Sequence, residues 1–178
     1  MNYYKTTLLP RSIKTRPRII LKARKQVQEF FDQYTPSEAL EMLLSACRAA
    51  ESNQVWDYHN PSEVLHFINA FKNLLVVVFP LTERELRRLG TVSEESEPGG
   101  YCQTLTKHLS PDEAADPSFT LFKYTRVNRL TDLKSKLDLI QEFALSKNSI
   151  VGSGNNLPIL TITELFAKFI ESSALLTY

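Results

Sequence analysis

The stretch NPSEVLHFINAFKNLLVVVF, residues 60–79, decides the fold class of this chain. Its apolar residues recur at the i, i+3, i+4, i+7 spacing that puts them on one face of an α-helix. Asn60 and Pro61 mark a helix start, because an Asn side chain accepts a bond from a free backbone N–H and proline has no N–H to leave unpaired. Residues 74–79 are all apolar, so we expect this end to be covered on every side. The stretch predicts a central helix.

Helix signals continue on both sides of this stretch. Residues 16–34 have apolar side chains at helical spacing, and Thr35 with Glu38 has the pattern of a capping box for a second helix. After Pro80, Thr82 and Glu85 repeat that pattern for a short helix that ends at Gly90.

The later part of the chain predicts helices over residues 132–147 and from Thr161 onward. Between them and Gly90 lies one ambiguous segment, 119–127, which mixes β-branched and aromatic residues without a clear period. This segment is compatible with one short β element or with a helix. The fold class predicted is mostly α, a single-domain irregular helical bundle of about five to seven helices.

The charge is unevenly distributed along the 178 residues, whose formal net charge is +1. Residues 1–28 contain eight basic and no acidic side chains, whereas the remainder contains 13 basic and 20 acidic ones. We therefore predict an extended basic arm over residues 1–15, a single helical domain over 16–178, and a mobile acidic loop over 91–100.

The basic N-terminal segment is a candidate nucleic-acid-binding site, because clustered cations attract the phosphate backbone. The alternative is that this segment pairs with the protein's own acidic body. The candidate residues are Arg11, Lys14, Arg16, Arg18, Lys22 and Lys25.

A second candidate site groups Asp57, His59, Glu63 and His66, which are residue types that bind metal ions. Glu63 and His66 are three residues apart on the predicted central helix, so they share one face. A di-metal carboxylate site needs a second Glu-x-x-His element, and the sequence has none. A solvated surface histidine is therefore the competing interpretation, and we expect no cofactor.

The two cysteines, Cys47 and Cys102, have no spacing typical of a disulfide framework or a metal site. Cys47 falls on the apolar face of a predicted helix and is expected to be a core residue. The N-terminus lacks the apolar region of a signal peptide, and no apolar run has the length of a membrane span. These features predict a cytoplasmic protein without membrane insertion.

Taken together, the capped helices are well specified and no catalytic motif accompanies them. The sequence favours a non-enzymatic helical interaction or scaffold protein, whose macromolecular partner is another protein or a second copy of this chain. One alternative is an accessory nucleic-acid-binding protein that uses residues 1–28. The other is a metal-dependent enzyme with a site around His59, Glu63 and His66.

Overall fold

The structure is a computed structural model that describes residues 16–52, 55–56, 60–90, 106–154 and 157–177. This part of the chain contains eight α-helices and one 3-10 turn, and no strand. The helices are α1 (Pro17–Gln33), α2 (Pro36–Glu51), α3 (Pro61–Val78), α4 (Glu83–Gly90), α6 (Pro111–Ala115), α7 (Pro117–Val127), α8 (Leu130–Ala144) and α9 (Ile159–Ala174), and the 3-10 turn is Val151–Ser153.

The mostly α class is confirmed, but the expected number of helices was too low and the β alternative for residues 119–127 was wrong. This segment forms α7. The helix begins because the Asp116 side chain accepts a hydrogen bond from Phe119 N at 3.0 Å, and Pro117 supplies the first helical position. The buried side chain of Leu121 then fixes α7 against the core. Capping and burial thus override the weak helix preference of the β-branched and aromatic residues.

The predicted caps account for the starts of α2 and α3, whereas α1, α8 and α9 begin without a side-chain cap, and α8 and α9 begin two residues earlier than predicted. Thr35 Oγ1 accepts from Glu38 N at 3.3 Å while the Glu38 carboxylate accepts from Thr35 N at 2.8 Å, which is the reciprocal capping box. The Asn60 side chain accepts from Ser62 N at 3.0 Å and begins α3. Local side-chain chemistry therefore sets where these helices begin.

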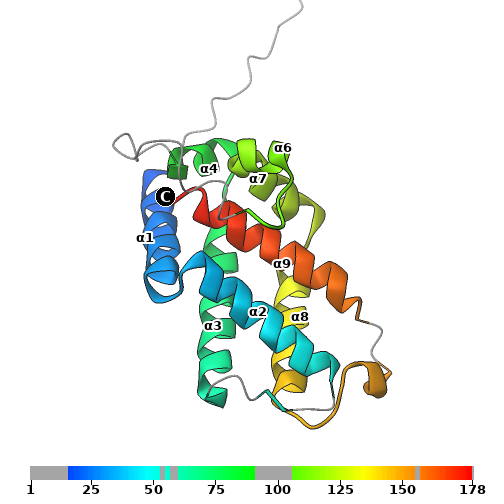
Figure 1. The fold of residues 1–178 in the computed structure, drawn as a ribbon. Helices are drawn as coiled ribbons and strands as arrows, with labels where there is room; N and C mark the ends of the chain where they lie inside the picture. The colour runs from blue at the N-terminus through cyan, green and yellow to red at the C-terminus, as the bar shows by residue number, and fades with distance from the viewer. Residues whose placement is uncertain (1–15, 53–54, 57–59, 91–105, 155–156, 178) are drawn as a thin grey trace, which may run out of the picture.

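The helices pack in crossing layers (Figure 1). Helices α2 and α9 lie side by side, and α2 also packs against α8. Helix α3 lies between α1 and α8, so it has neighbours on both flanks. Helices α4, α6 and α7 gather at one end of the molecule, where the end of α9 also lies (Figure 1).

The central helix α3 supplies the middle of the hydrophobic core. Phe67, Ile68 and Phe71 are fully buried and belong to one cluster of buried residues that runs from Ile20 to Leu176. The ring of Phe71 lies 5.3 Å from that of Phe166 on α9 and 6.2 Å from that of Phe30 on α1, measured between centroids. Phe71 of α3 therefore packs against aromatic rings of both α1 and α9.

The expectation that residues 74–79 are covered on every side was wrong at one position. Val76 is 42% exposed, whereas Leu74, Leu75 and Val78 are buried. The reason is helical geometry, because residue 76 points away from the face that packs on α1 and α8.

No single helix in the described ranges has both the length and the apolar character needed to cross a membrane. Helices α3 and α4 together meet the requirements of length and composition, but they form a pair bent by 117°.

Candidate functional site

Arg16, the first described residue, is held by a carboxylate 69 positions later in the sequence. The Glu85 carboxylate accepts from Arg16 Nε at 3.0 Å, from Nη2 at 2.9 Å and from the backbone N at 3.3 Å. It also accepts from Thr82 N and Thr82 Oγ1, both at 3.0 Å. Arg16 further donates to Pro80 O at 2.9 Å. This arrangement fastens the start of α1 to the corner between α3 and α4.

The environment of Glu85 strongly favours its charged form. The side-chain hydrogen bond from Arg16 is the largest cause, and with the bonds from Thr82 it lowers the pKa of Glu85 from 4.5 to about 2, although burial of the carboxyl opposes the shift. The Glu85 side chain is 3% exposed, whereas that of Arg16 is 45% exposed. Solvent at Arg16 therefore weakens the pair, and we assign the carboxylate about 2 kcal/mol of stability at neutral pH.

This pair predicts an acid-dependent loss of stability. Because the folded-state pKa of Glu85 is depressed, its contribution is fully present above about pH 4.5 and is lost as pH falls through about 2. Urea unfolding between pH 7 and pH 2 should show Arg16→Gln less stable than the parent at neutral pH, with the difference closing in acid. The exposed neighbour Arg18→Gln is the control, and an equal effect of both substitutions at every pH would contradict this account.

The remaining basic candidates on α1 face solvent. Arg18, Lys22 and Lys25 are exposed, and Lys25 Nζ lies 3.5 Å from the Glu29 carboxylate one turn later. Between them lies Leu21, a large apolar side chain that is 68% exposed. These four residues follow the i, i+3, i+4, i+7 spacing, so they form a single outward stripe on α1.

Helix α4 adds two cations that sequence reasoning missed. Arg84 and Arg88 are exposed, and they are four residues apart on one face of α4. Arg24 Nη2 donates to the carbonyl oxygen of Arg88 at 2.6 Å, which brings the end of α4 against α1. We refer to Arg18, Leu21, Lys22, Lys25, Arg84 and Arg88 as the basic surface. In the sequence only the arginines of α4 hinted at this surface, since the proximity of α1 and α4 is a tertiary feature.

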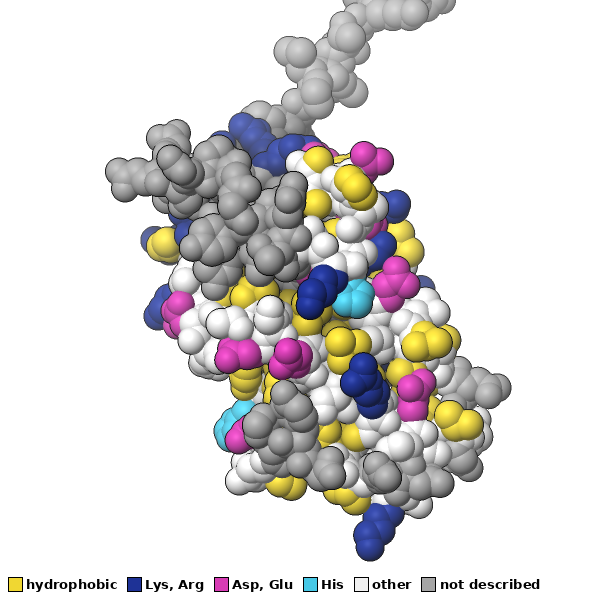
Figure 2. All heavy atoms as spheres, in the orientation of Figure 1, with side chains coloured by type: hydrophobic (Ala, Val, Ile, Leu, Met, Phe, Trp, Pro, Cys, Tyr) yellow, Lys and Arg dark blue, Asp and Glu magenta, His cyan; other side chains and the backbone are white. Residues whose placement is uncertain are grey.

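Figure 2 shows Lys and Arg side chains at the end of the molecule where α1 and α4 meet. Of the six basic residues proposed from the sequence, Arg16 is engaged by Glu85, while Arg18, Lys22 and Lys25 belong to the basic surface. Arg11 and Lys14 lie outside the described residues.

The proposed metal ligands are only partly described. Glu63 and His66 are exposed on α3 and line an open groove of about 640 Å³ with Tyr34, Glu38 and Glu41. Burial and the nearby Glu63 charge raise the pKa of Tyr34. The described part of the chain contains no group of three or more His, Cys, Asp or Glu able to hold a metal ion. Asp57 and His59 lie outside it, so the four-residue metal site stays a prediction.

Cys47 is a buried free thiol on α2, as its place on the apolar face predicted. Burial raises the pKa of the Cys47 thiol to about 11, so the reactive thiolate is scarce at neutral pH. This environment is typical of a core cysteine. Cys102 lies outside the described residues.

The strongest candidate site is thus a surface on which exposed cations of α1 and α4 accompany one exposed leucine, Leu21. Comparison with known families, with curated proteins and with solved structures finds no match to this chain.

Proposed function

We propose that this protein is a non-enzymatic helical interaction protein that binds an acidic protein partner on the basic surface. The supporting observation is the outward stripe of α1, in which Leu21 is 68% exposed among Arg18, Lys22 and Lys25. The helical bundle predicted for residues 16–178 would support this stripe rigidly. We propose that the protein acts in the cytoplasm, as the sequence predicts.

The electrostatics of the surface favour an acidic partner. The α1 stripe itself contributes three cations, and one of them, Lys25, lies 3.5 Å from the carboxylate of Glu29. Rim cations of this kind raise the association rate and select against basic partners. An acidic segment would therefore be attracted before any close contact forms.

The exposed leucine favours a protein partner over nucleic acid. A few central side chains that lose all their water supply most of the affinity of protein interfaces, whereas exposed charges at the rim contribute less. Single-stranded nucleic acid is instead held by aromatic side chains that stack on bases, and Leu21 offers none. The partner should accordingly present an apolar side chain flanked by carboxylates.

Quantitative affinity capture from a lysate tests this proposal with two variants of equal charge change. Arg18→Glu/Lys22→Glu alters the basic surface, and Arg129→Glu/Lys147→Glu alters exposed positions elsewhere. We expect the parent and Arg129→Glu/Lys147→Glu to capture at least one protein in common. Arg18→Glu/Lys22→Glu should capture about tenfold less of that protein, because its acidic side chains would then face carboxylates instead of cations. Identical captured sets for both variants would contradict the proposal.

Nucleic acid is the second candidate, because Arg84 and Arg88 extend the α1 cations over a second helix. In that case the purified protein would have a raised ratio of absorbance at 260 nm to that at 280 nm. Its binding to a single-stranded oligonucleotide would fall steeply with salt and would be unaffected by Leu21→Ser. These results together would identify the partner as a nucleic acid and not a protein.

A further inference from the structure

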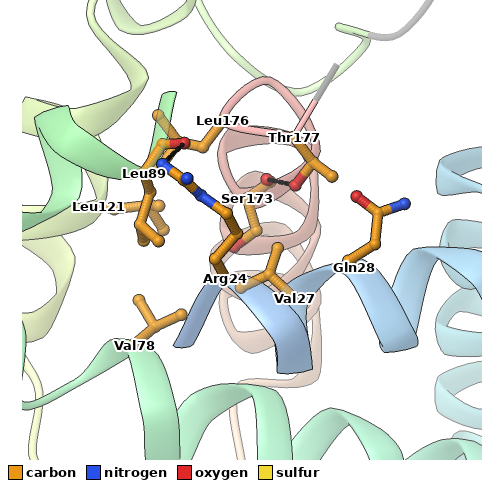
Figure 3. Close-up of a pocket in the computed structure, with 9 residues that line it drawn as sticks. All are labelled: Arg24, Val27, Gln28, Val78, Leu89, Leu121, Ser173, Leu176 and Thr177. Atoms are coloured by element: carbon orange, nitrogen blue, oxygen red, sulfur yellow. Dashed lines mark hydrogen bonds between the residues drawn. The ribbon is translucent and has the colours of Figure 1, made fainter. Parts of the chain in front are cut away.

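A cavity of about 180 Å³ lies where α1 and α7 meet the C-terminal ends of α3, α4 and α9, and its described lining includes none of the residues of the basic surface. Its described lining comes from α1, α3, α4, α7 and the end of α9, which converge at one end of the molecule (Figure 1). Apolar side chains form most of the wall, and four polar residues complete it (Figure 3). The apolar residues are Val27, Val78, Leu89, Leu121 and Leu176, and the polar ones are Arg24, Gln28, Ser173 and Thr177.

Arg24 is fixed along the wall of this cavity. Its Nη2 donates to the carbonyl oxygens of Arg88 at 2.6 Å and Leu89 at 3.2 Å, which belong to the last turn of α4. Figure 3 shows the side chain reaching from α1 to this helix end. A cation is favoured there by the partial negative charge of the helix C-terminus. The guanidinium is thereby held in place before any ligand arrives.

Two donors of the lining are buried and have no hydrogen-bond partner in the structure. They are Arg24 Nε and Ser173 Oγ, and Ser173 is 1% exposed. Thr177 Oγ1 donates to the backbone carbonyl oxygen of Ser173 and not to its hydroxyl, which has no partner (Figure 3). Buried polar groups are nearly always paired in native proteins. Two orphaned donors on one cavity therefore indicate an acceptor that binds between the apolar walls.

The charge around the cavity favours an anionic acceptor. The described lining contains one ionised side chain, the Arg24 cation, and no carboxylate. Among the described residues, no acidic side chain forms an ion pair with Arg24. A carboxylate would accept from both donors and neutralise the half-buried Arg24 cation, and charge-assisted bonds of this kind are stronger than neutral ones.

The size and the walls define the rest of the ligand. A cavity of about 150 Å³ lined by apolar side chains accommodates a molecule as large as benzene. Gln28, which is exposed, lies at the solvent side of the lining and leaves a route of entry. The geometry points to a binding site for a small organic carboxylate with a branched aliphatic or single-ring body, whose carboxylate is held by Arg24 Nε and Ser173 Oγ.

A backbone-amide NMR titration of the full chain tests this site with four probes. Sodium 4-methylpentanoate and sodium benzoate carry the carboxylate, and 4-methylpentanamide and benzamide are their uncharged isosteres. We expect the carboxylates to bind with a Kd of about 0.1–1 mM, as suits ligands of this size, and the amides at least about fivefold more weakly. The shifted amides should lie around Arg24, Leu121 and Ser173.

Two adjacent serines provide a matched pair of variants. Ser172 and Ser173 are both buried on α9 with unpaired hydroxyls, but only Ser173 is among the described residues that line the cavity. Ser173→Ala should weaken carboxylate binding about tenfold, and Ser172→Ala should leave it unchanged. Arg24→Met should remove the preference for carboxylates over amides. Arg24→Met also loses the hydrogen bonds to the last turn of α4. If this variant does not fold, the comparison of Ser173→Ala with Ser172→Ala tests the site alone.

Three results would each overturn the inference. The first is the absence of saturable binding by either carboxylate at concentrations well above the expected Kd. The second is equal affinity for carboxylates and amides, which would mean that the orphaned donors are satisfied by water. The third is an equal effect of Ser173→Ala and Ser172→Ala. None of these results bears on the basic surface, so the proposed function is tested separately.

Discussion

Replacing Phe71 by alanine is expected to lower the free energy of unfolding by about 4 kcal/mol, which is typical of a buried phenylalanine. Phe71 is fully buried, and its ring centroid lies between 5.3 and 6.2 Å from those of Phe30, Phe67, Phe166 and Phe169. Its removal leaves a cavity at the junction of α1, α3 and α9, because rings on three helices cannot all collapse into the gap. Urea unfolding followed by circular dichroism gives the measurement.

The chain offers a matched control for this substitution. Phe119 on α7 is 50% exposed, so Phe119→Ala should change the free energy of unfolding by no more than about 0.5–1 kcal/mol. Phe71→Leu should cost less than Phe71→Ala, since it retains most of the buried volume. If Phe71→Ala and Phe119→Ala had similar effects, α3 would not be the centre of the core.

Substitution of Glu171 by glutamine is expected to lower the free energy of unfolding by about 2–4 kcal/mol. The Glu171 side chain on α9 is fully buried. Its Oε1 accepts from Lys107 N at 2.9 Å and from His108 N at 3.1 Å, and its Oε2 accepts from His108 N and Leu109 N, both at 3.0 Å. Glutamine would turn an N–H donor toward these backbone N–H donors and leave buried groups unpaired.

The control lies on the same helix. Glu164 is an exposed residue of α9 whose carboxylate lies 3.6 Å from Lys168 Nζ, and a surface pair of this kind contributes little. Glu164→Gln should therefore change stability by less than about 0.5 kcal/mol. Both variants can be compared by urea unfolding at pH 7. Equal stabilities would show that residues 107–109 do not depend on Glu171.

Local chemistry explains why the starts of α2 and α3 could be predicted. Thr35 with Glu38 satisfies backbone N–H groups within one turn, and Asn60 does so at the start of α3, so these signals need only neighbouring residues. The start of α7 was missed because its cap, Asp116, precedes a segment whose composition favours strands. The exposure of Val76 was missed because residues 74–79 are all apolar, so the sequence does not show which of them faces solvent.

The sites depend on contacts that sequence spacing does not show. Arg16 and Glu85 are 69 residues apart, so the sequence indicated only that a basic head could pair with an acidic body. Lys107 and Glu171 are separated by 64 residues, and no pattern pointed to that contact. The orphaned donors of the cavity, Arg24 and Ser173, come from opposite ends of the chain. Only the packing of the helices brings these groups together.

The basic surface is the central claim, and the contribution of Leu21 tests it most directly. Leu21 is 68% exposed on α1 and Leu160 is 80% exposed on α9, so Leu21→Ser and Leu160→Ser remove comparable apolar side chains. The measurement is the Kd, by isothermal titration, of the partner identified through charge reversal. We predict that Leu21→Ser raises this Kd about tenfold or more and that Leu160→Ser leaves it unchanged. Equal Kd values for both variants and the parent would contradict the account.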